Sequence, residues 1–536
     1  MEHFSRLGFF NLLLIRRCRQ SIALPIDALP LDILRIMTGL LLLGYFLRTL
    51  LEISDFSESG GLIDHQLTTE IFWFTRLGLF QSWMSGEVFQ FIFLFACLCA
   101  VFLIIGFQVK LSAALLYLIA VSTYRWNFLV MYVDDSIMHL LLFWMFVLPV
   151  GRTLILSDWI KNGRAAWNSW KTVTVPGTAL RCFLWNLSLI YLIAGLWKWT
   201  SPMWREGVAL YVVLKLPISY GHDFWGLEHL PILKIFNYTT LILEPLFPLM
   251  FVLPKGHFTK YALLLGFICL HLGSVATLDI PFANLACAGV AIVIFREELM
   301  QWIRCSPKKS DVPDTPAGID FYGGTAIFMV VMLTFAMISS VVLPQWRAPT
   351  GQNFDAEFQT APSSQATQQE SRVSGFRGES DEFRNEGLGS VQTTFFGILW
   401  TMGIAQQYQL FNWIDDRNFA VHYTINEYQD NGTVHGIDPN MMFLPSTRGV
   451  LLQFYVHGIT WMRIPPERRE ELRRSLLTRT AHRFCKNYKP IGKVEVYSSI
   501  ERIEPRDEKT EKQDTFLMSF GCNNAEPFVQ ELTIMP

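Results

Sequence analysis

The chain has 536 residues, of which 51% are hydrophobic and only 17% charged, and its formal net charge is −2. Soluble domains carry about 25% charged residues, and the apolar residues here are also clustered, so the composition favours an integral membrane protein. A net charge so close to zero gives no overall basic field, and we expect no nucleic-acid partner.

The N-terminal segment 1–24 is predicted to be a cytoplasmic or interfacial tail. Its basic residues Arg16, Arg17 and Arg19 follow a short apolar run, which is the reverse of the order in a cleavable signal peptide.

Nine apolar segments follow, and each approaches the length of about 20 residues that a transmembrane helix needs. They cover 32–52, 88–108, 111–131, 135–150, 179–198, 231–253, 260–279, 281–296 and 322–343. Lysine and arginine gather before the first segment and in every second loop, so the positive-inside rule predicts a cytoplasmic N-terminus and an extracytoplasmic C-terminal part. We expect a transmembrane domain over 25–300, then a cytoplasmic loop and the last transmembrane helix over 301–343.

The last third of the chain changes character. Residues 344–390 are rich in Ser, Gln, Gly and charge, which predicts a disordered linker. Residues 391–536 contain three β-rich stretches, "FAVHYTINEY", "GVLLQFYVHGI" and "GKVEVYSSIERI", a hairpin signal "DNGT" and a charge-laced helix after a proline pair. The expected fold class is therefore a membrane α-helical bundle of about nine helices, followed by an extracytoplasmic, β-rich α+β domain.

The cysteines and histidines show no metal-ligand spacing, so we predict no metal. Seven cysteines lie in or beside apolar segments and are expected to be small apolar core residues. Cys485 and Cys522 lie in the C-terminal domain. They form a disulfide if that domain faces an oxidising compartment, and they stay free thiols if it does not.

Lys198 ends the fifth apolar segment in "YLIAGLWKWTSPMWREG", between Trp197 and Trp199. One interpretation is a lysine that extends its ammonium group to the membrane surface within a belt of tryptophans. The other is a lysine held in an apolar pocket, where it can be a neutral amine and act as a base.

Four more ionisable residues lie in apolar segments, where each needs a physical reason. Asp135 and His139 are four residues apart, so they share one helix face, either as a helix N-cap with a structural histidine or as a proton-handling pair. Asp134 precedes them. Glu244, in "LILEPLFPL", must be neutral or paired. His271, with Asn284 nearby in sequence, is either a structural hydrogen-bonding residue or a functional one.

These stretches resemble the vitamin K-dependent gamma-carboxylases and their bacterial relatives, the horizontally transferred transmembrane (HTTM) domain proteins. "YLIAGLWKW…MWREG" is similar to the family signature YFIAG-x-K-K…W-x-x-G, and "PLDILRIMTGLLLL" resembles the opening helix with its arginine, here Arg35. "DDSIMHLLLFWMFVLPVGRTLILSDW", "LILEPLFPL" and "FICLHLGSVATLDIPFANL" resemble later parts in the same order. The resemblance covers roughly 25–300 and also implies an outer β-rich domain.

The resemblance implies an enzyme that uses reduced vitamin K or menaquinol. Lys198 aligns with the base that deprotonates the hydroquinone. Reaction with dioxygen then yields a quinone epoxide and an alkoxide that removes a proton from a protein glutamate, which carbon dioxide carboxylates. His271 matches a histidine near the reaction centre, and we expect Asp135 or His139 to orient substrate or relay protons. The expected quinone-site residues are Trp197, Trp199, Glu244 and Asn284.

The implied partners are the lipid bilayer, the quinone and a secreted protein or peptide at the outer face. Two departures weaken the carboxylation step: Trp197 replaces the first lysine of the family pair, and Asp134 and Asp135 replace an Asn-His pair. Quinol deprotonation is therefore better supported than carboxylation. The alternative function is a non-enzymatic membrane accessory protein that binds or matures a secreted peptide.

Overall fold

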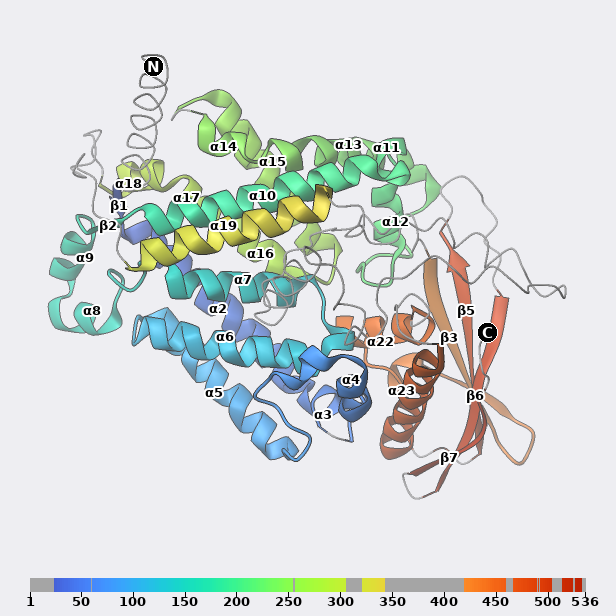
Figure 1. The fold of residues 1–536 in the computed structure, drawn as a ribbon. Helices are drawn as coiled ribbons and strands as arrows, with labels where there is room; N and C mark the ends of the chain where they lie inside the picture. The colour runs from blue at the N-terminus through green and yellow to red at the C-terminus, as the bar shows by residue number, and fades with distance from the viewer. Residues whose placement is uncertain are drawn as a thin grey trace, which may run out of the picture.

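The computed structural model describes residues 24–58, 60–253, 256–304, 321–342, 419–458, 466–488, 490, 492–503, 513–523 and 526–532. Within them the chain forms a helical bundle and a smaller region built on one β-sheet (Figure 1). Residues 1–23 of the expected tail, the expected linker 344–390, residues 391–418, Cys18 and Cys305 lie outside the described residues.

Four helices of the described chain are long and apolar enough to cross a membrane. They are α2 (Leu29–Leu51), α5 (Gly86–Ile105), α10 (Thr178–Thr200) and α15 (Phe258–Thr277). The other expected spans coincide with α6 (Val109–Trp126), α7 (Val133–Val147), α13 (Leu230–Leu246) with α14 (Leu249–Val252), α16 (Pro281–Gly289) with α17 (Ala291–Ile294), and α19 (Phe321–Val342). The described part of the chain is thus mostly helical with four candidate membrane-spanning helices, and the count of nine crossings stays a prediction.

A small β-ladder joins two of these helices at their starts. β1 (Pro25–Asp27) precedes α2, β2 (Thr174–Pro176) precedes α10, and the two strands pair antiparallel with Ile26 opposite Val175. The ladder places the first turns of α2 and α10 side by side.

The start of α2 contains a fully buried ion pair. Arg35 Nε donates to Asp32 Oδ1 at 2.8 Å, and both side chains have no exposed surface. The other guanidinium hydrogens go to carbonyls of α5 and of the loop after α7, including those of Ile104 at 2.8 Å and Leu154 at 2.9 Å. Asp32 also accepts the backbone N–H groups of residues 151, 152 and 153. Because every charge is paired, Arg35 ties α2, α5 and this loop together as a structural residue.

The C-terminal sheet region, the described residues 419–532, contains a five-stranded antiparallel sheet of order β4-β3-β5-β6-β7. The strands are β3 (Phe419–Tyr428), β4 (Val434–Ile437), β5 (Lys493–Arg502), β6 (Gln513–Asn523) and β7 (Glu526–Leu532). The predicted hairpin joins β3 to β4, with Gly432 at φ +81°, a conformation that favours glycine.

Two helices of the sheet region, α22 (Thr447–Gly458) and α23 (Pro466–Asn487), lie between the sheet and the bundle (Figure 1). α23 is the predicted charge-laced helix. The prediction of a β-stretch at "GVLLQFYVHGI" was wrong, because residues 449–458 form most of α22. Leu452 and Val456, four residues apart, are fully buried on one face of that helix. A short apolar run fits either period, and packing against neighbouring elements decides between them.

The sheet region shares an apolar core with one end of the bundle, a contact we call the junction. From the bundle come α3 (Ile53–Phe56), α4 (His65–Ile71), the loop between them and the 3-10 helix η2 (Phe128–Val130). Polar contacts border this core: Arg483 Nε lies 2.7 Å from Asp55, and Arg479 lies 3.2 Å from Asp64. The junction therefore holds the two regions by both apolar burial and charge pairs.

Cys485 of α23 and Cys522 of β6 form a disulfide, with their Cα atoms 5.5 Å apart. Of the two alternatives for these cysteines, the structure shows the paired one. Of the other predicted core cysteines, Cys97, Cys99, Cys182 and Cys287 are buried as free thiols, while Cys269 is exposed on α15.

Candidate functional site

Lys198 is buried in the last turn of α10 and points into the bundle. Only 2% of its surface is exposed, and its Nζ lies 2.5 Å from Oε2 of Glu244 on α13, which is itself 8% exposed. The same Nζ lies 5.4 Å from the ring centroid of Trp204. The interpretation of Lys198 as a residue that extends to the membrane surface is therefore wrong.

The pairing depends on how closely α10 approaches α13. A Cβ atom added at Gly195, one turn before Lys198, would lie 2.6 Å from Cδ of Pro245 and 3.2 Å from Cβ of Glu244. Only glycine leaves the room that α13 occupies. The glycine of "IAG", Gly195, is thus required for the close packing of α10 and α13 that brings Lys198 within reach of Glu244.

Pro245 also leaves one backbone carbonyl of α13 without its helical hydrogen-bond donor. Proline has no N–H, so the carbonyl of Leu241, four residues earlier, lacks its usual helical donor. Trp199 Nε1 donates to this carbonyl at 3.0 Å. Three consecutive contacts therefore join the two helices: Gly195 to Pro245, Lys198 to Glu244, and Trp199 to Leu241.

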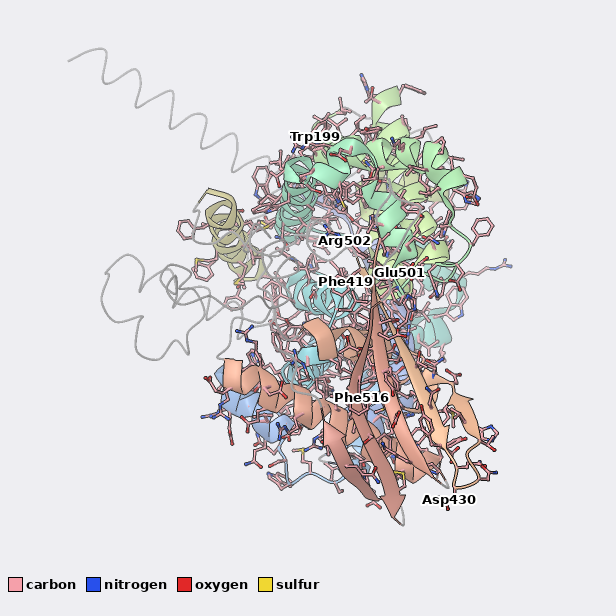
Figure 2. The ribbon with its side chains drawn as sticks, turned by 90° about the vertical axis from the view of Figure 1, so that its right-hand side faces the viewer. Trp199, Phe419, Asp430, Glu501, Arg502 and Phe516 are labelled. Carbon is pink, nitrogen blue, oxygen red and sulfur yellow. A yellow bond between two sulfur atoms is a disulfide. The ribbon has the colours of Figure 1, made fainter. Side chains whose placement is uncertain are left out.

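The tryptophans of the motif have different environments. Trp199 is 49% exposed and lies near the top of the bundle in Figure 2, far from the sheet residues Asp430 and Phe516. Trp197 is partly buried against the main core. Trp204, the third tryptophan of the motif, is only 2% exposed and forms one wall of the Lys198 environment.

Trp204 is fixed by a residue that the sequence did not single out. Asn237 of α13 is fully buried; its Nδ2 donates to the Trp204 carbonyl at 2.8 Å, and its Oδ1 accepts the Leu210 N–H at 3.2 Å. α11 (Pro202–Glu206), which carries Trp204, is thereby attached to the same helix that carries Glu244.

His271 of α15 lies at the centre of a second buried network. Its Nδ1 is 2.8 Å from Oδ1 of Asn284, and its Nε2 is 2.7 Å from the hydroxyl of Tyr191. Asn284 Nδ2 donates to the Ile280 carbonyl at 2.8 Å, so its Oδ1 is the acceptor towards His271. The imidazole of His271 therefore carries its proton on Nδ1, and its Nε2 accepts a hydrogen bond from the Tyr191 hydroxyl.

Tyr191 links this network to Lys198 along one face of α10, seven residues or about two turns away. Its ring stacks on Phe247 with centroids 4.3 Å apart and meets Phe267 edge-on at 5.1 Å. The structure therefore brings Lys198, Glu244, His271 and Asn284 into one aromatic-walled region of α10, α13, α15 and α16.

The acidic pair at the start of α7 lies in a third cluster. Tyr132 is the N-cap residue of α7 and Asp135 lies within its first turn, so the interpretation of Asp135 as the N-cap is wrong. Asp135 Oδ2 accepts the N–H of Tyr132 at 2.9 Å, and its Oδ1 accepts from the Tyr45 hydroxyl and from Arg448 Nη2 at 3.2 Å. Asp134 accepts the Ala283 N–H at 2.8 Å and that of Phe282 at 3.3 Å. His139 packs edge-on against Tyr124, with ring centroids 5.2 Å apart.

Two cavities border the junction. The larger, about 750 Å³, lies between residues 60–70 and α23. The smaller, about 10 Å³, is lined by Tyr45, Arg48, Thr49, Glu52, Tyr132, Phe282 and Arg448 and has room for about one water molecule. Lys198 lines neither of them.

In comparisons with known proteins, the chain matches no protein-family model, no curated protein and no solved structure. Within the described ranges, no three His, Cys, Asp or Glu side chains are grouped so that they could hold a metal ion.

Proposed function

We propose that the protein is an HTTM-type, vitamin K-dependent gamma-carboxylase-like membrane enzyme that deprotonates a reduced quinone at Lys198. The observation that carries the proposal is the buried Lys198–Glu244 pair inside a motif that resembles the family's base. A lysine with no such role would be expected to extend its charge to water, as helix-end lysines commonly do.

The pair has the protonation chemistry that a base needs. When it is neutral overall it holds one exchangeable proton, as ammonium and carboxylate or as amine and carboxylic acid. The proposed step uses the second form, in which the proton of the pair lies on Glu244. In that form Lys198 is an amine that can take a proton from a phenolic hydroxyl, and Glu244 stays hydrogen-bonded to the resulting ammonium group.

The aromatic character of the side chains around the pair suits a flat, mostly apolar substrate. Tyr191, Phe247, Phe267 and Trp204 supply aromatic surface near the pair, and the Tyr191–His271–Asn284 chain supplies hydrogen-bonding groups beside it. A bound quinol would supply the chemistry with dioxygen. The chain's own residues would orient it, hold the proton at Lys198 and keep bulk water away.

The C-terminal sheet region is proposed to face an oxidising, extracytoplasmic compartment. Its disulfide supports this placement, because structural disulfides are rare in reducing compartments. The basic residues of the loops, which favour the opposite side for the N-terminus, agree with it. A secreted peptide substrate would then meet the enzyme at this face.

The test is quinone epoxide formation by the purified full-length protein supplied with menaquinol and air, with labelled bicarbonate and a glutamate-containing peptide to detect carboxylation. Lys198→Met is expected to lower epoxide formation by about 10²–10⁴-fold, the usual contribution of a general base. Lys234→Met, which replaces a partly exposed lysine of α13, is the matched control and should keep full activity.

Undiminished epoxide formation by Lys198→Met would refute the proposal. Epoxide formation without label in the peptide would retain Lys198 as the quinol base and remove the carboxylation step. Absence of epoxide from the wild-type protein, together with peptide binding, would favour the accessory-protein alternative.

A further inference from the structure

We propose that Arg448 and Thr447, at the start of α22, are positioning residues that fix His271 from the C-terminal sheet region. The effect of these two residues on catalysis rests on the proposed function, whereas their structural effect is on the position of α16. It gives the sheet region a defined effect on the site inside the bundle.

The first step is the insertion of Arg448 into the end of the bundle. Its side chain is 5% exposed, and its Nη2 lies 3.2 Å from Asp135, a residue 313 positions earlier in the chain. Asp135 is fully buried and also accepts the Tyr45 hydroxyl. A buried carboxylate is stable only while its partners are in place, so this contact requires the sheet region to be docked.

The second step runs through the neighbouring residue. Asp134 caps the start of α16 by accepting the N–H groups of Phe282 and Ala283. The next residue, Asn284, accepts from His271 Nδ1. Arg448, by holding the first turn of α7, therefore holds the first turn of α16 and with it the orientation of the His271 ring.

Thr447 holds the same corner from its other side. Its Oγ1 donates to the Asp279 carbonyl at 3.1 Å and also contacts the Asp279 carboxylate, which Arg48 binds with both terminal nitrogens at 3.0 and 2.8 Å. Asp279 precedes Ile280, whose carbonyl accepts from Asn284. Two adjacent residues of the sheet region thus clamp the α15–α16 corner that carries one of the two hydrogen-bond partners of His271.

A matched control exists at the same junction. Arg483 also docks the sheet region on the bundle, through Asp55 of α3 at 2.7 Å, and it binds the Met441 carbonyl within the sheet region at 2.9 Å. Neither of these contacts is with α16. Substituting a residue that only docks the sheet region should leave α16 unchanged, as expected for Arg483. Substituting a positioning residue should loosen the start of α16.

The experiment is hydrogen–deuterium exchange of the purified full-length protein, wild type against Arg448→Met, Thr447→Val and Arg483→Met. We expect amides 282–284 to exchange at least 10-fold faster in Arg448→Met and in Thr447→Val, and at the wild-type rate in Arg483→Met. Wild-type exchange at these amides in folded Arg448→Met, or an equal rise in Arg483→Met, would overturn the proposal. If Arg448→Met fails to fold, the nearly isosteric Thr447→Val decides by the same criterion.

A second readout connects the clamp to activity. Arg448→Met should alter the pH profile of epoxide formation, because His271 loses its fixed tautomer, whereas Arg483→Met should leave the profile unchanged. An altered profile in both variants would reduce Arg448 to a docking residue. If the wild-type protein forms no epoxide, the proposed function fails while the exchange experiment still decides the positioning role.

Discussion

Lys198 and Glu244 form a buried ion pair across two helices, with 2.5 Å between Nζ and Oε2 and a sequence separation of 46. Removing one partner of such a pair leaves an uncompensated buried charge and costs about 3–5 kcal/mol, whereas replacing both by apolar residues of similar size is often neutral. Stability and activity can therefore be separated at this site.

We predict that Lys198→Met lowers the free energy of unfolding by about 3–5 kcal/mol and that adding Glu244→Leu restores most of this loss. The double variant should remain inactive in epoxide formation, because the base is still absent. Thermal unfolding in detergent and the epoxide assay measure the two effects. A double variant that regains activity would show that the pair only supports the fold.

Gly195→Ala should destabilise the bundle by about 1–3 kcal/mol, because the added methyl group would overlap Pro245 and force α13 away from α10. The matched control is Gly273→Ala on α15, where an added Cβ meets no atom within 4 Å. That change should be neutral or stabilise by up to about 1 kcal/mol through helix propensity. Thermal unfolding of the two variants is the measurement, and equal midpoints would contradict the packing argument.

The Cys485–Cys522 disulfide closes a loop of sequence separation 37, for which chain entropy predicts a contribution of about 4 kcal/mol. Replacing both cysteines by alanine should lower the unfolding midpoint of the sheet region by a corresponding amount. In cells, a maleimide reagent should label these two positions in the denatured protein only after reduction. Labelling without reduction would argue against an oxidising compartment.

His65 should make the junction sensitive to acid. Its Nε2 lies 3.3 Å from Asn127, its ring stacks on Trp126, and burial lowers its pKa from the usual 6.5 to about 4. Between these two values the unfolded chain binds a proton that the folded chain does not, so the free energy of unfolding falls as pH drops from 6.5 to 4. The total loss is about 3 kcal/mol.

His65→Gln, which keeps a hydrogen-bond donor for Asn127 but does not titrate, should flatten this dependence, as measured by unfolding midpoints between pH 7.5 and 4.5. His435→Gln, an exposed change in β4, should leave the slope as in the wild type. If His65→Gln retains the wild-type slope, another group is responsible for the acid sensitivity.

The sequence predicted the ionisable residues of the site better than their partners. Glu244 and His271 were recognisable because a charge or imidazole within an apolar run demands a reason. Their pairing with Lys198 and Asn284 depends on how α10, α13, α15 and α16 rotate against one another, which Gly195 and Pro245 help to set and which no single-helix pattern contains.

The contribution of the sheet region could not be predicted in this way. Thr447 and Arg448 stand in a short polar stretch before residues that were expected to form a strand, so nothing in the local pattern indicated buried side chains. Their partners Asp279 and Asp135 lie 168 and 313 residues earlier. Contacts of that range arise from docking of whole regions.

The small ladder between β1 and β2 constrains the path of the chain in a way that hydropathy cannot. Since it holds the first turns of α2 and α10 together, both helices start on the same side if both span the bilayer. The chain must then traverse the membrane an even number of times before α10 begins. If α2 and α10 both span the bilayer, the number of crossings in the first third of the chain cannot be wrong by one. The ends of α2 and α10, with Tyr45 and Lys198, then belong to the same leaflet.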